Sequence, residues 1–432
     1  MLDLKFVRDN QDLVKQAIKN KNSKVNLDEV LALDERYRKL LTELEAKRAE
    51  QNRQTNKGKP GPEVMEQLKQ LKEALKLLEE EVKRTAVELE QLSSLIPNIP
   101  STDTPIGTDE AGNKILRQWG RPTTFAFPAK EHWELGKALG VLDTEKAGAI
   151  SGTRFGYILG GLAQLEFALI QFALAILTDE KALKKIIRTA KLTISPKPFI
   201  AVVPPVMIRP EVFQRMARLE PKEERYHIPS DDIYLVGSAE HTLGPLHMDE
   251  ILEEKLLPIR YVGFSTAFRR EAGSYGKDTK GILRVHQFDK VEMESFTVAE
   301  QAVAEQDFFV AIQEYLLQQL VLPYQVVQIC TGDMGGPDAR QIDLETWLPG
   351  QNRYRETHTA DLMTDYQARR LNTRVRRGNH NEFVHMNDAT VIAIGRTLIA
   401  IMENYQTEPG TIKIPKVLQK YLPGLKEIKR SV

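Results

Sequence analysis

Arginine and glutamate side chains gather in one stretch of the chain, residues 268–292. Phe268-Arg269-Arg270-Glu271 opens a loop rich in glycine, lysine and arginine, and the loop ends in residues 284–292. Arginine offers a planar fork of donors that suits phosphate or carboxylate groups, and loop glycines let the backbone approach a ligand closely. The stretch therefore predicts a site for a ligand that carries phosphate or carboxylate.

Other familiar kinds of site are missing from the sequence. It contains neither a GxxxxGK[ST] loop nor a GxGxxG turn, and its eight histidines form no HExxH or HxH pair. Cys330 is the only cysteine, so an intramolecular disulfide framework and a cysteine-built zinc site are excluded. We expect no zinc, and the cysteine usage fits a reducing cytoplasm.

Length and charge restrict the class of protein. A chain of 432 residues exceeds what one compact core usually holds, so two or more structural units are expected. Sixty Lys and Arg residues balance sixty Asp and Glu residues, so the formal net charge is zero. A polyanionic partner would therefore have to bind a local basic patch rather than the whole surface. The most apolar stretch, residues 157–177, is interrupted by Gln164, Glu166 and Gln171, which predicts a core helix and no membrane partner. The N-terminus lacks the pattern of a secretory signal, which favours a cytoplasmic protein.

The first hundred residues predict two long helices. Apolar residues recur at steps of three and four over residues 26–56, and a second run over residues 63–96 keeps the heptad spacing of a coiled coil. The segment 58–62, which contains Gly and Pro, separates the two runs, so an antiparallel hairpin is expected. About thirty residues of helix reach roughly 45 Å, so this arm must project.

The distal half of the predicted hairpin is basic. Residues 36–72 carry ten Lys and Arg side chains against five Glu, a net charge of +5 in a neutral protein. One interpretation is a charged surface that keeps a coiled coil soluble. The other is a rod that presents phosphate-binding groups to a nucleic acid.

Beyond residues 96–100 the pattern changes to mixed strands and helices. Residues 199–203, 259–264 and 324–329 read as strands, and residues 131–140 and 298–320 read as helices. The strands are not each followed by a crossover helix, so an antiparallel or mixed sheet with packed helices is expected. The predicted fold is α+β, with a helical arm over residues 1–103 and a domain built on this sheet over residues 104–432.

The amino-acid sequences of several segments resemble those of one family. Residues 268–292 resemble motif 2 of the class II aminoacyl-tRNA synthetases, in the form typical of seryl-tRNA synthetases, and residues 392–398 with 403–406 are similar to motif 3. The segments 132–136, 331–334 and 366–370 match this family too, and the helical hairpin is one of its hallmarks. The resemblance covers nearly the whole chain.

The resemblance implies a seven-stranded antiparallel catalytic sheet, a homodimer and an arm that grips serine tRNA. It also implies two steps: L-serine and ATP give seryl-adenylate, and the seryl group then passes to the 3′ end of the tRNA. Because the serine carboxylate is already ionised, with a pKa of about 3.5, no enzymatic base is needed and none is evident. Mg²⁺ would accompany ATP, and whether selenocysteine tRNA is also charged stays open.

Site residues follow from the resemblance, motif by motif. Arg269, Glu356 and Arg396 would carry the chemistry, with Arg269 on the α-phosphate and serine carboxylate, Arg396 on the γ-phosphate and Glu356 on Mg²⁺. ATP would further contact Arg270, Glu271, Val285, Thr357, His358 and Thr359. L-serine would be held by Ser238, Ala239, Glu240, Arg269, Glu292 and Thr390. The subunit interface would involve residues 155–176, which look like motif 1.

Three segments depart from the family pattern. Ser238 stands where the family usually has threonine, and residues 357–360 read Thr-His-Thr-Ala in place of Ser-Ser-Cys-Ser. Residues 387–391 replace the usual Asn-Gly-Ser-Gly before motif 3, which leaves the roles of Asn387 and Asp388 open. These changes lie beside the expected serine pocket, where they could alter rate or amino-acid specificity.

Three other interpretations compete with an active seryl-tRNA synthetase. One is a relative that keeps the fold but no longer charges tRNA, although Arg269, Glu271, Glu292, Glu356 and Arg396 are all present. Another is a ligase that charges a protein carrier, which predicts a remodelled hairpin. The last is an interaction coiled coil on an unrelated enzyme.

Overall fold

The protein is described here from a computed structural model, which covers residues 1–55, 62–273, 276, 278 and 280–430. The chain divides into two compact units, Met1–Ile99 and Pro100–Val432. The boundary predicted from the sequence, after residue 103, lies a few residues further along. The predicted Gly/Pro turn at residues 58–62 falls almost entirely outside the described residues.

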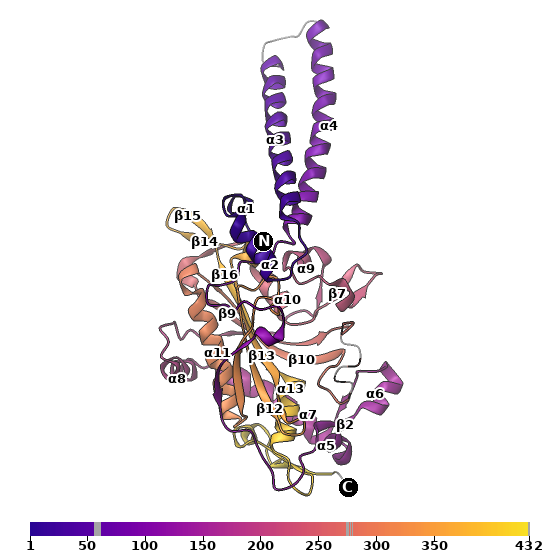
Figure 1. Ribbon diagram of the computed structural model, residues 1–432, viewed down its shortest axis with the longest axis vertical. Helices are drawn as coiled ribbons and strands as arrows, with labels where there is room; N and C mark the ends of the chain where they lie inside the picture. Colours follow the sequence, from indigo (N-terminus) through magenta and orange to yellow (C-terminus); the bar gives the residue numbers. More distant parts are fainter. Residues whose placement is uncertain (56–61, 274–275, 277, 279, 431–432) are drawn as a thin grey trace. The chain divides into compact units, whose positions relative to one another are not determined.

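The first unit is helical, and two of its helices are long (Figure 1). Helices α3 and α4 lie side by side, as the two apolar stripes predicted. Leu44 of α3 packs with Leu75 and Leu78 of α4, and the neighbouring Leu40, Leu71 and Val82 extend this seam. The helices of the unit are α1 (Leu4–Asp9), α2 (Gln11–Asn20), α3 (Leu27–Thr55) and α4 (Pro62–Ser93).

A buried carboxylate interrupts the apolar stripe of α3. Asp34 is 2% exposed and accepts two hydrogen bonds from Arg8 of α1, at 3.0 and 2.9 Å. It also accepts one from Arg38, one helical turn further on. Because a buried charge is costly unless it is paired, these two arginines allow Asp34 to join α1 to α3.

The second unit is built around one large sheet (Figure 1). Its strands run in the order β1-β11-β12-β13-β16-β10-β9-β4. They are β1 (Lys114–Trp119), β4 (Ile200–Val202), β9 (Ile259–Phe268), β10 (Gln287–Thr297), β11 (Tyr324–Gln328), β12 (Arg340–Leu348), β13 (Arg353–Thr364) and β16 (His385–Ala393). Smaller sheets contain β2 (Leu142–Asp143), β3 (Tyr157–Ile158), β5 (Met207–Ile208), β6 (His227–Ile228), β7 (Ile233–Leu235), β8 (Ile251–Glu253), β14 (Arg374–Arg377), β15 (His380–Phe383), β17 (Ile412–Lys413) and β18 (Glu427–Ile428).

The strand directions refine the sheet that the sequence predicted. Every neighbouring pair from β1 through β9 is antiparallel, which makes the expected seven antiparallel strands. The eighth strand, β4, pairs with β9 in the parallel direction. The sheet is therefore mixed, because β4 is reached through helices rather than a tight hairpin.

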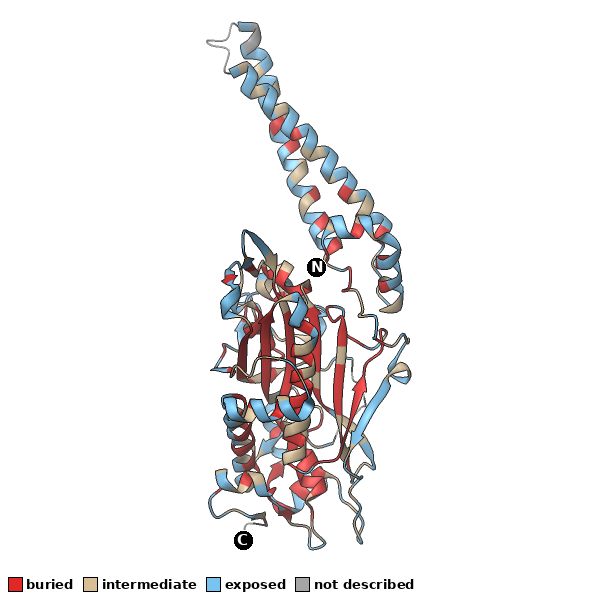
Figure 2. Cartoon of the chain, turned by 90° about the vertical axis from the view of Figure 1, so that its left-hand side faces the viewer, coloured by how far each residue is buried: buried red, intermediate tan, exposed pale blue. Residues whose placement is uncertain are grey.

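Alternating side chains give the large sheet one apolar and one polar face. Ile342, Ala360 and Ala389 belong to the main core, whereas their neighbours Gln341 and Asp361 line a cavity. Helix α11 covers the apolar face, because its Gln306 and Gln313 donate to backbone carbonyls of β12, β13 and β16. The alternation follows from the two-residue period of a strand. Figure 2 shows that strands in the middle of this unit are buried, whereas the edge strands β1 and β4 are largely exposed.

The helices of this unit surround the sheet. Helix α7 is the apolar segment predicted to be a core helix, and among the described residues it is the one helix long and apolar enough to span a membrane. Eight of its residues are buried, and they join the same core as α11 and α13. The helices are α5 (His132–Leu139), α6 (Thr144–Ser151), α7 (Gly160–Leu177), α8 (Glu180–Ala190), α9 (Pro210–Arg215), α10 (Glu240–Leu243), α11 (Ala302–Gln319), α12 (Tyr366–Leu371) and α13 (Ile394–Asn404).

Candidate active site

One cavity of about 330 Å³ lies over the polar face of the sheet. Arg269, from the end of β9, and Arg396, from the first turn of α13, both line it although they are far apart in the chain. An adjoining hollow shares Arg218, Arg269 and Glu271 with this cavity and is also lined by Glu240. The cavity collects most of the residues proposed from sequence, namely Arg269, Glu271, Val285, Glu356, Thr357, Thr359, Thr390 and Arg396.

The loop after β9 forms one side of the cavity. Arg269 donates to the carbonyl of Gly237 at 3.1 Å, and its guanidinium lies 5.4 Å from the centre of the Phe288 ring. Glu271 has a φ of 52°, a left-handed conformation that is uncommon for a residue other than glycine. Arg284 donates to its carboxylate at 2.8 Å and keeps that strained residue in place. Phe288 of β10 and Gly237 thus hold Arg269, and Arg284 of the same loop holds Glu271.

A β-bulge shapes the opposite side of the cavity. The register between β12 and β13 shifts beside Thr357, so Glu356, Thr357 and Thr359 all reach the cavity. Arg396 donates to the Glu356 carboxylate at 2.7 Å and to its carbonyl at 3.0 Å. Burial would raise the pKa of Glu356, but the guanidinium groups of Arg396 and Arg269 outweigh it and lower that pKa. Glu356 is therefore an ionised oxygen donor.

Three residues proposed for ATP or serine lie elsewhere. His358 is 1% exposed and is absent from the cavity wall, because the strand turns it toward the core face. Burial lowers its pKa to about 3, so its imidazole is neutral. Ala239 is buried in a separate apolar cluster. Arg270 also does not line the cavity, and its backbone N–H donates to the carbonyl of Glu224.

Ser238 and Glu292 meet behind the cavity wall. The Ser238 hydroxyl donates to Glu292 at 2.8 Å, and Lys290, which lines the cavity, forms an ion pair with the same carboxylate. Burial raises the pKa of Glu292, although Lys290 opposes this effect. Thr390 reaches the cavity from the neighbouring strand, where it stands opposite Glu292 in register. The departure from threonine at Ser238 thus keeps a hydroxyl, which contacts Glu292, another residue expected to hold serine.

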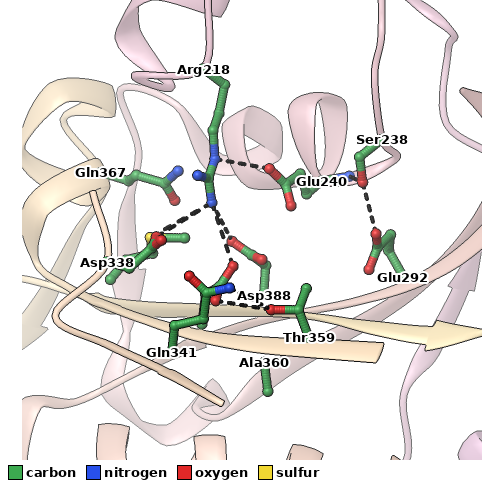
Figure 3. Close-up of polar contacts among 12 residues, drawn as sticks. Arg218, Ser238, Glu240, Glu292, Asp338, Gln341, Thr359, Ala360, Gln367 and Asp388 are labelled. Carbon is green, nitrogen blue, oxygen red and sulfur yellow. Dashed lines mark hydrogen bonds and ion pairs between the residues drawn. The ribbon is translucent and has the colours of Figure 1, made fainter. Parts of the chain in front are cut away.

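A buried ionic cluster, which the sequence did not indicate, lies at the end of the cavity (Figure 3). Arg218 follows α9, belongs to no recognised motif and lines the cavity. Its guanidinium approaches four carboxylates that come from four separate segments of the chain. The partners are Glu240 at 2.9 Å, Asp388 at 3.3 Å, Asp338 at 3.6 Å and Asp361 at 3.9 Å. Since no two of these residues share a local pattern, no sequence signal could have grouped them.

The four carboxylates of this cluster differ in their charge. Burial would raise the pKa of Glu240, but Arg218 outweighs it and holds that pKa well below its ordinary value. For Asp388, burial and the nearby Glu240 and Asp361 carboxylates raise the pKa well above the usual range. The pKa of Asp361 is raised well above its usual range as well, by burial and then by Asp338. Of Glu240, Asp361 and Asp388, Glu240 is therefore the one held as a carboxylate at neutral pH.

The sheet and its cavity are those of a class II aminoacyl-tRNA synthetase. Residues 224–405 match the tRNA synthetase class II core domain (G, H, P, S and T), and residues 1–100 match the seryl-tRNA synthetase N-terminal domain. The serine–tRNA ligase of Symbiobacterium thermophilum is 40% identical over 430 residues, which cover 98% of each chain. The chain belongs to the seryl-tRNA synthetases.

Solved structures agree with this assignment. The seryl-tRNA synthetase of Pyrococcus horikoshii complexed with ATP is similar over 100% of both chains, with a TM-score of 0.88 and 36% identity. The cytoplasmic serine–tRNA ligase of Naegleria fowleri in complex with AMP covers 98% of this chain and 96% of its own, with a TM-score of 0.82 and 30% identity. The protein is thus an ATP-dependent ligase that activates L-serine and transfers the seryl group to the 3′ end of serine tRNA. The interpretation of a coiled coil on an unrelated enzyme is wrong, because both units match one family.

Proposed function

We propose that the cavity holds ATP and L-serine together, with Arg269 between them. The observation that carries this proposal is that Arg269 and Arg396 line one cavity with Glu356 and Glu271. A serine carboxylate oxygen bonds to the α-phosphorus of ATP, the bond from that phosphorus to the bridging oxygen breaks, and pyrophosphate leaves with the electron pair. Arg269 neutralises charge on the α-phosphate and Arg396 on the γ-phosphate, so catalysis rests on positioning and electrostatics.

The second step uses the same cavity. The terminal ribose hydroxyl of the tRNA attacks the seryl carbonyl carbon, AMP leaves with the electron pair of the broken bond, and the hydroxyl proton passes to a phosphate oxygen of AMP or to water. No side chain is required as a base, which agrees with the position of His358, buried and outside the cavity wall. Adenine is assigned to Glu271, and the Val285 backbone would lie along the nucleotide.

Serine is assigned to Ser238, Glu240, Glu292 and Thr390. The ionised Glu240 pairs with the ammonium group of serine, and Thr390 and Glu292 hydrogen-bond to the serine hydroxyl. Buried polar groups that only the hydroxyl can satisfy discriminate against alanine by about 10⁴–10⁵-fold, far better than shape does. Support comes from the hydrogen bond between Ser238 and Glu292 and from the cross-strand position of Thr390.

Mg²⁺ is assigned to Glu356 together with ATP phosphate oxygens. The residues present fit that ion, because Glu356 is ionised, Thr357 and Thr359 add hydroxyls, and Glu345 stands opposite Glu356 in register. Among the described residues no three His, Cys, Asp or Glu side chains are grouped to hold a metal by themselves. An ion shared with substrate phosphates requires no such group. When bound, it would neutralise charge on the phosphates.

The remaining assignments concern partners. Residues 1–103 are proposed to bind serine tRNA through their basic distal half, and residues 104–432 to carry catalysis in a cytoplasmic homodimer. The apolar side chains of Phe167, Tyr157 and Leu159 are 63%, 42% and 41% exposed on and just before α7, which supports a subunit interface there. A sedimentation mass near that of one 49.1 kDa chain would contradict the dimer.

Pyrophosphate exchange with each of the twenty amino acids tests the activation step without tRNA. We expect exchange that depends on L-serine, and exchange with alanine or threonine that is weaker by orders of magnitude. Charging assays with serine tRNA and with selenocysteine tRNA then show which acceptors are used. Serine-independent exchange, or a preference for another amino acid, would overturn the assignment of the pocket.

A further inference from the structure

Arg218 occupies the junction between the amino-acid end of the cavity and the buried acidic cluster. Its Nε lies 2.9 Å from Oε1 of Glu240, which begins α10. On the other side its Nη2 lies 3.3 Å from Asp388 of β16, 3.6 Å from Asp338 and 3.9 Å from Asp361 of β13. The side chain of Arg218 is 15% exposed, and that exposed part faces the cavity and the adjoining hollow.

The carboxylates hold this guanidinium in one position. Asp338, Asp361 and Asp388 are each at most 6% exposed. Asp338 and Asp388 lie on the side of Arg218 away from Glu240 (Figure 3), and Asp361 contacts the same Nη2 atom as they do. A planar guanidinium that is gripped at both ends has little rotational freedom, unlike a lysine ammonium. Because Asp361 and Asp388 lie on β13 and β16, Arg218 ties the Glu240 carboxylate to the sheet.

The charge of Glu240 also depends on this contact. Glu240 is 9% exposed, and burial without a cation would favour its neutral form. The other groups near it do not replace this cation. Lys290 pairs with Glu292, and Arg225 donates to the carbonyl of Arg218. His241 lies 3.5 Å from the Glu240 carboxylate, but burial lowers the pKa of its imidazole to about 4, so it is neutral. Without Arg218, the pocket would present a neutral or reoriented carboxyl to the ammonium of the substrate.

We propose that Arg218 is a positioning residue for amino-acid recognition, which fixes the Glu240 carboxylate so that it receives the ammonium group of serine. The proposal rests on the assignment of Glu240 to serine given above. It also assigns a role to Asp388, one of the departures before motif 3, as a part of the support behind Arg218. The ATP side of the cavity, around Arg396 and Glu356, is not involved.

Pyrophosphate-exchange kinetics of Arg218→Ala separate this role from a general structural one. We expect KM for serine to rise on the order of 10²-fold, the usual scale for removing one partner of a buried charge pair, while KM for ATP stays within about 3-fold. Millimolar methylguanidine should restore much of the serine affinity of Arg218→Ala, because it can occupy the vacated space among the carboxylates. Arg215→Ala is the matched control, since Arg215 lies in α9 three residues earlier and pairs with the exposed Asp249.

Glu240→Gln distinguishes failure of this proposal from failure of the Glu240 assignment. If Glu240→Gln leaves KM for serine unchanged, the Glu240 assignment is wrong and the Arg218 proposal falls with it. If Glu240→Gln raises KM while Arg218→Ala does not, only the Arg218 proposal is overturned. A parallel loss of serine and ATP affinity without methylguanidine rescue also overturns it.

Two milder variants keep the test decisive if Arg218→Ala does not fold. Arg218→Lys retains the charge without the planar guanidinium, and Asp388→Ala removes one of the acceptors that contact Arg218. Each should raise KM for serine by roughly 3- to 10-fold with KM for ATP unchanged. Wild-type serine kinetics in both variants would contradict the positioning role.

Discussion

Arg396 and Glu356 are joined by an ion pair of 2.7 Å across the cavity, from the first turn of α13 to the bulged strand β13. The carboxylate of Glu356 thus holds the guanidinium at the cavity wall, and Arg396 in turn keeps Glu356 ionised. Neither group can turn away from the cavity without losing the other. Their contact therefore prearranges the end of the site that would receive the phosphates of ATP.

Replacing Arg396 should weaken the use of ATP far more than the binding of serine. For Arg396→Ala we expect kcat/KM for ATP to fall by about 10²–10³-fold, the usual scale for removing a preorganised donor to developing charge. KM for serine should change little. Pyrophosphate exchange at varied ATP and at varied serine measures both effects, with Arg377→Ala, an arginine in exposed ion pairs, as the control. An equal rise in both KM values would contradict the assignment.

Glu356→Gln tests the assigned Mg²⁺ ligand. The amide cannot supply a charged oxygen, so we expect the Mg²⁺ concentration for half-maximal exchange to rise by about tenfold or more. Glu345→Gln, its cross-strand neighbour, provides a comparison. If Glu356→Gln loses activity at every Mg²⁺ concentration without a shift of the midpoint, its role would be to hold Arg396 rather than the ion.

The basic half of the arm should act on tRNA and not on the activation step. Arg53, Lys69 and Lys72 are exposed near the end of the hairpin, and their combined replacement by glutamate should raise KM for tRNA at least tenfold. The dependence of tRNA binding on salt should also become less steep. Pyrophosphate exchange should not change, because it needs no tRNA. Glu50→Gln with Glu66→Gln is the control, and equal loss of charging and exchange would count against the tRNA role of the arm.

The spacing of apolar residues along the chain predicted the helices and strands well, but it did not indicate the buried ion pairs. The helical arm, β9, β11, α5 and α11 were found from runs of apolar residues, because each run makes its own short-range pattern. Arg218 could not be found in this way, since its partners converge only after β12, β13 and β16 align. The bulge at Thr357 was equally hidden, because one extra residue in a strand leaves no mark on its composition.

Arg260 shows the same limit inside a correctly predicted strand. The sequence Ile259-Arg260-Tyr261 suggests an exposed arginine between two buried neighbours, yet Arg260 is among the largest fully buried side chains. Its partner Glu305 lies on α11, 45 residues further along the chain. A pair of opposite charges at that separation is one of many in the sequence, so only the packing of α11 on the sheet identifies it.

A carboxyl on α7 gives the protein a pH-dependent stability. Burial, with Asp289 beside it, raises the pKa of Glu166 to about 8. The folded state therefore holds a proton that the unfolded chain releases near pH 4.5, so this group lowers the stability progressively from about pH 4.5 to pH 8. Glu166→Gln should raise the melting temperature at pH 8 and have little effect at pH 4.5. The exposed Glu180→Gln should show no such difference, and parallel melting curves for Glu166→Gln and wild type would contradict this expectation.

The buried pair of Arg260 and Glu305 should be costly to break singly. Two hydrogen bonds of 2.9 and 2.6 Å join them, and Arg260 also donates to the carbonyls of Ser195 and Lys197. Glu305→Ala leaves an uncompensated buried charge, so the free energy of unfolding should fall by about 3–5 kcal/mol. The double variant Arg260→Met/Glu305→Leu should lose less than the sum of its two single changes, because it leaves no lone charge. Urea unfolding of all four proteins completes this cycle, with the surface variant Glu254→Ala expected to cost about 0–1 kcal/mol. Additive losses in the cycle would show that the two side chains do not stabilise each other.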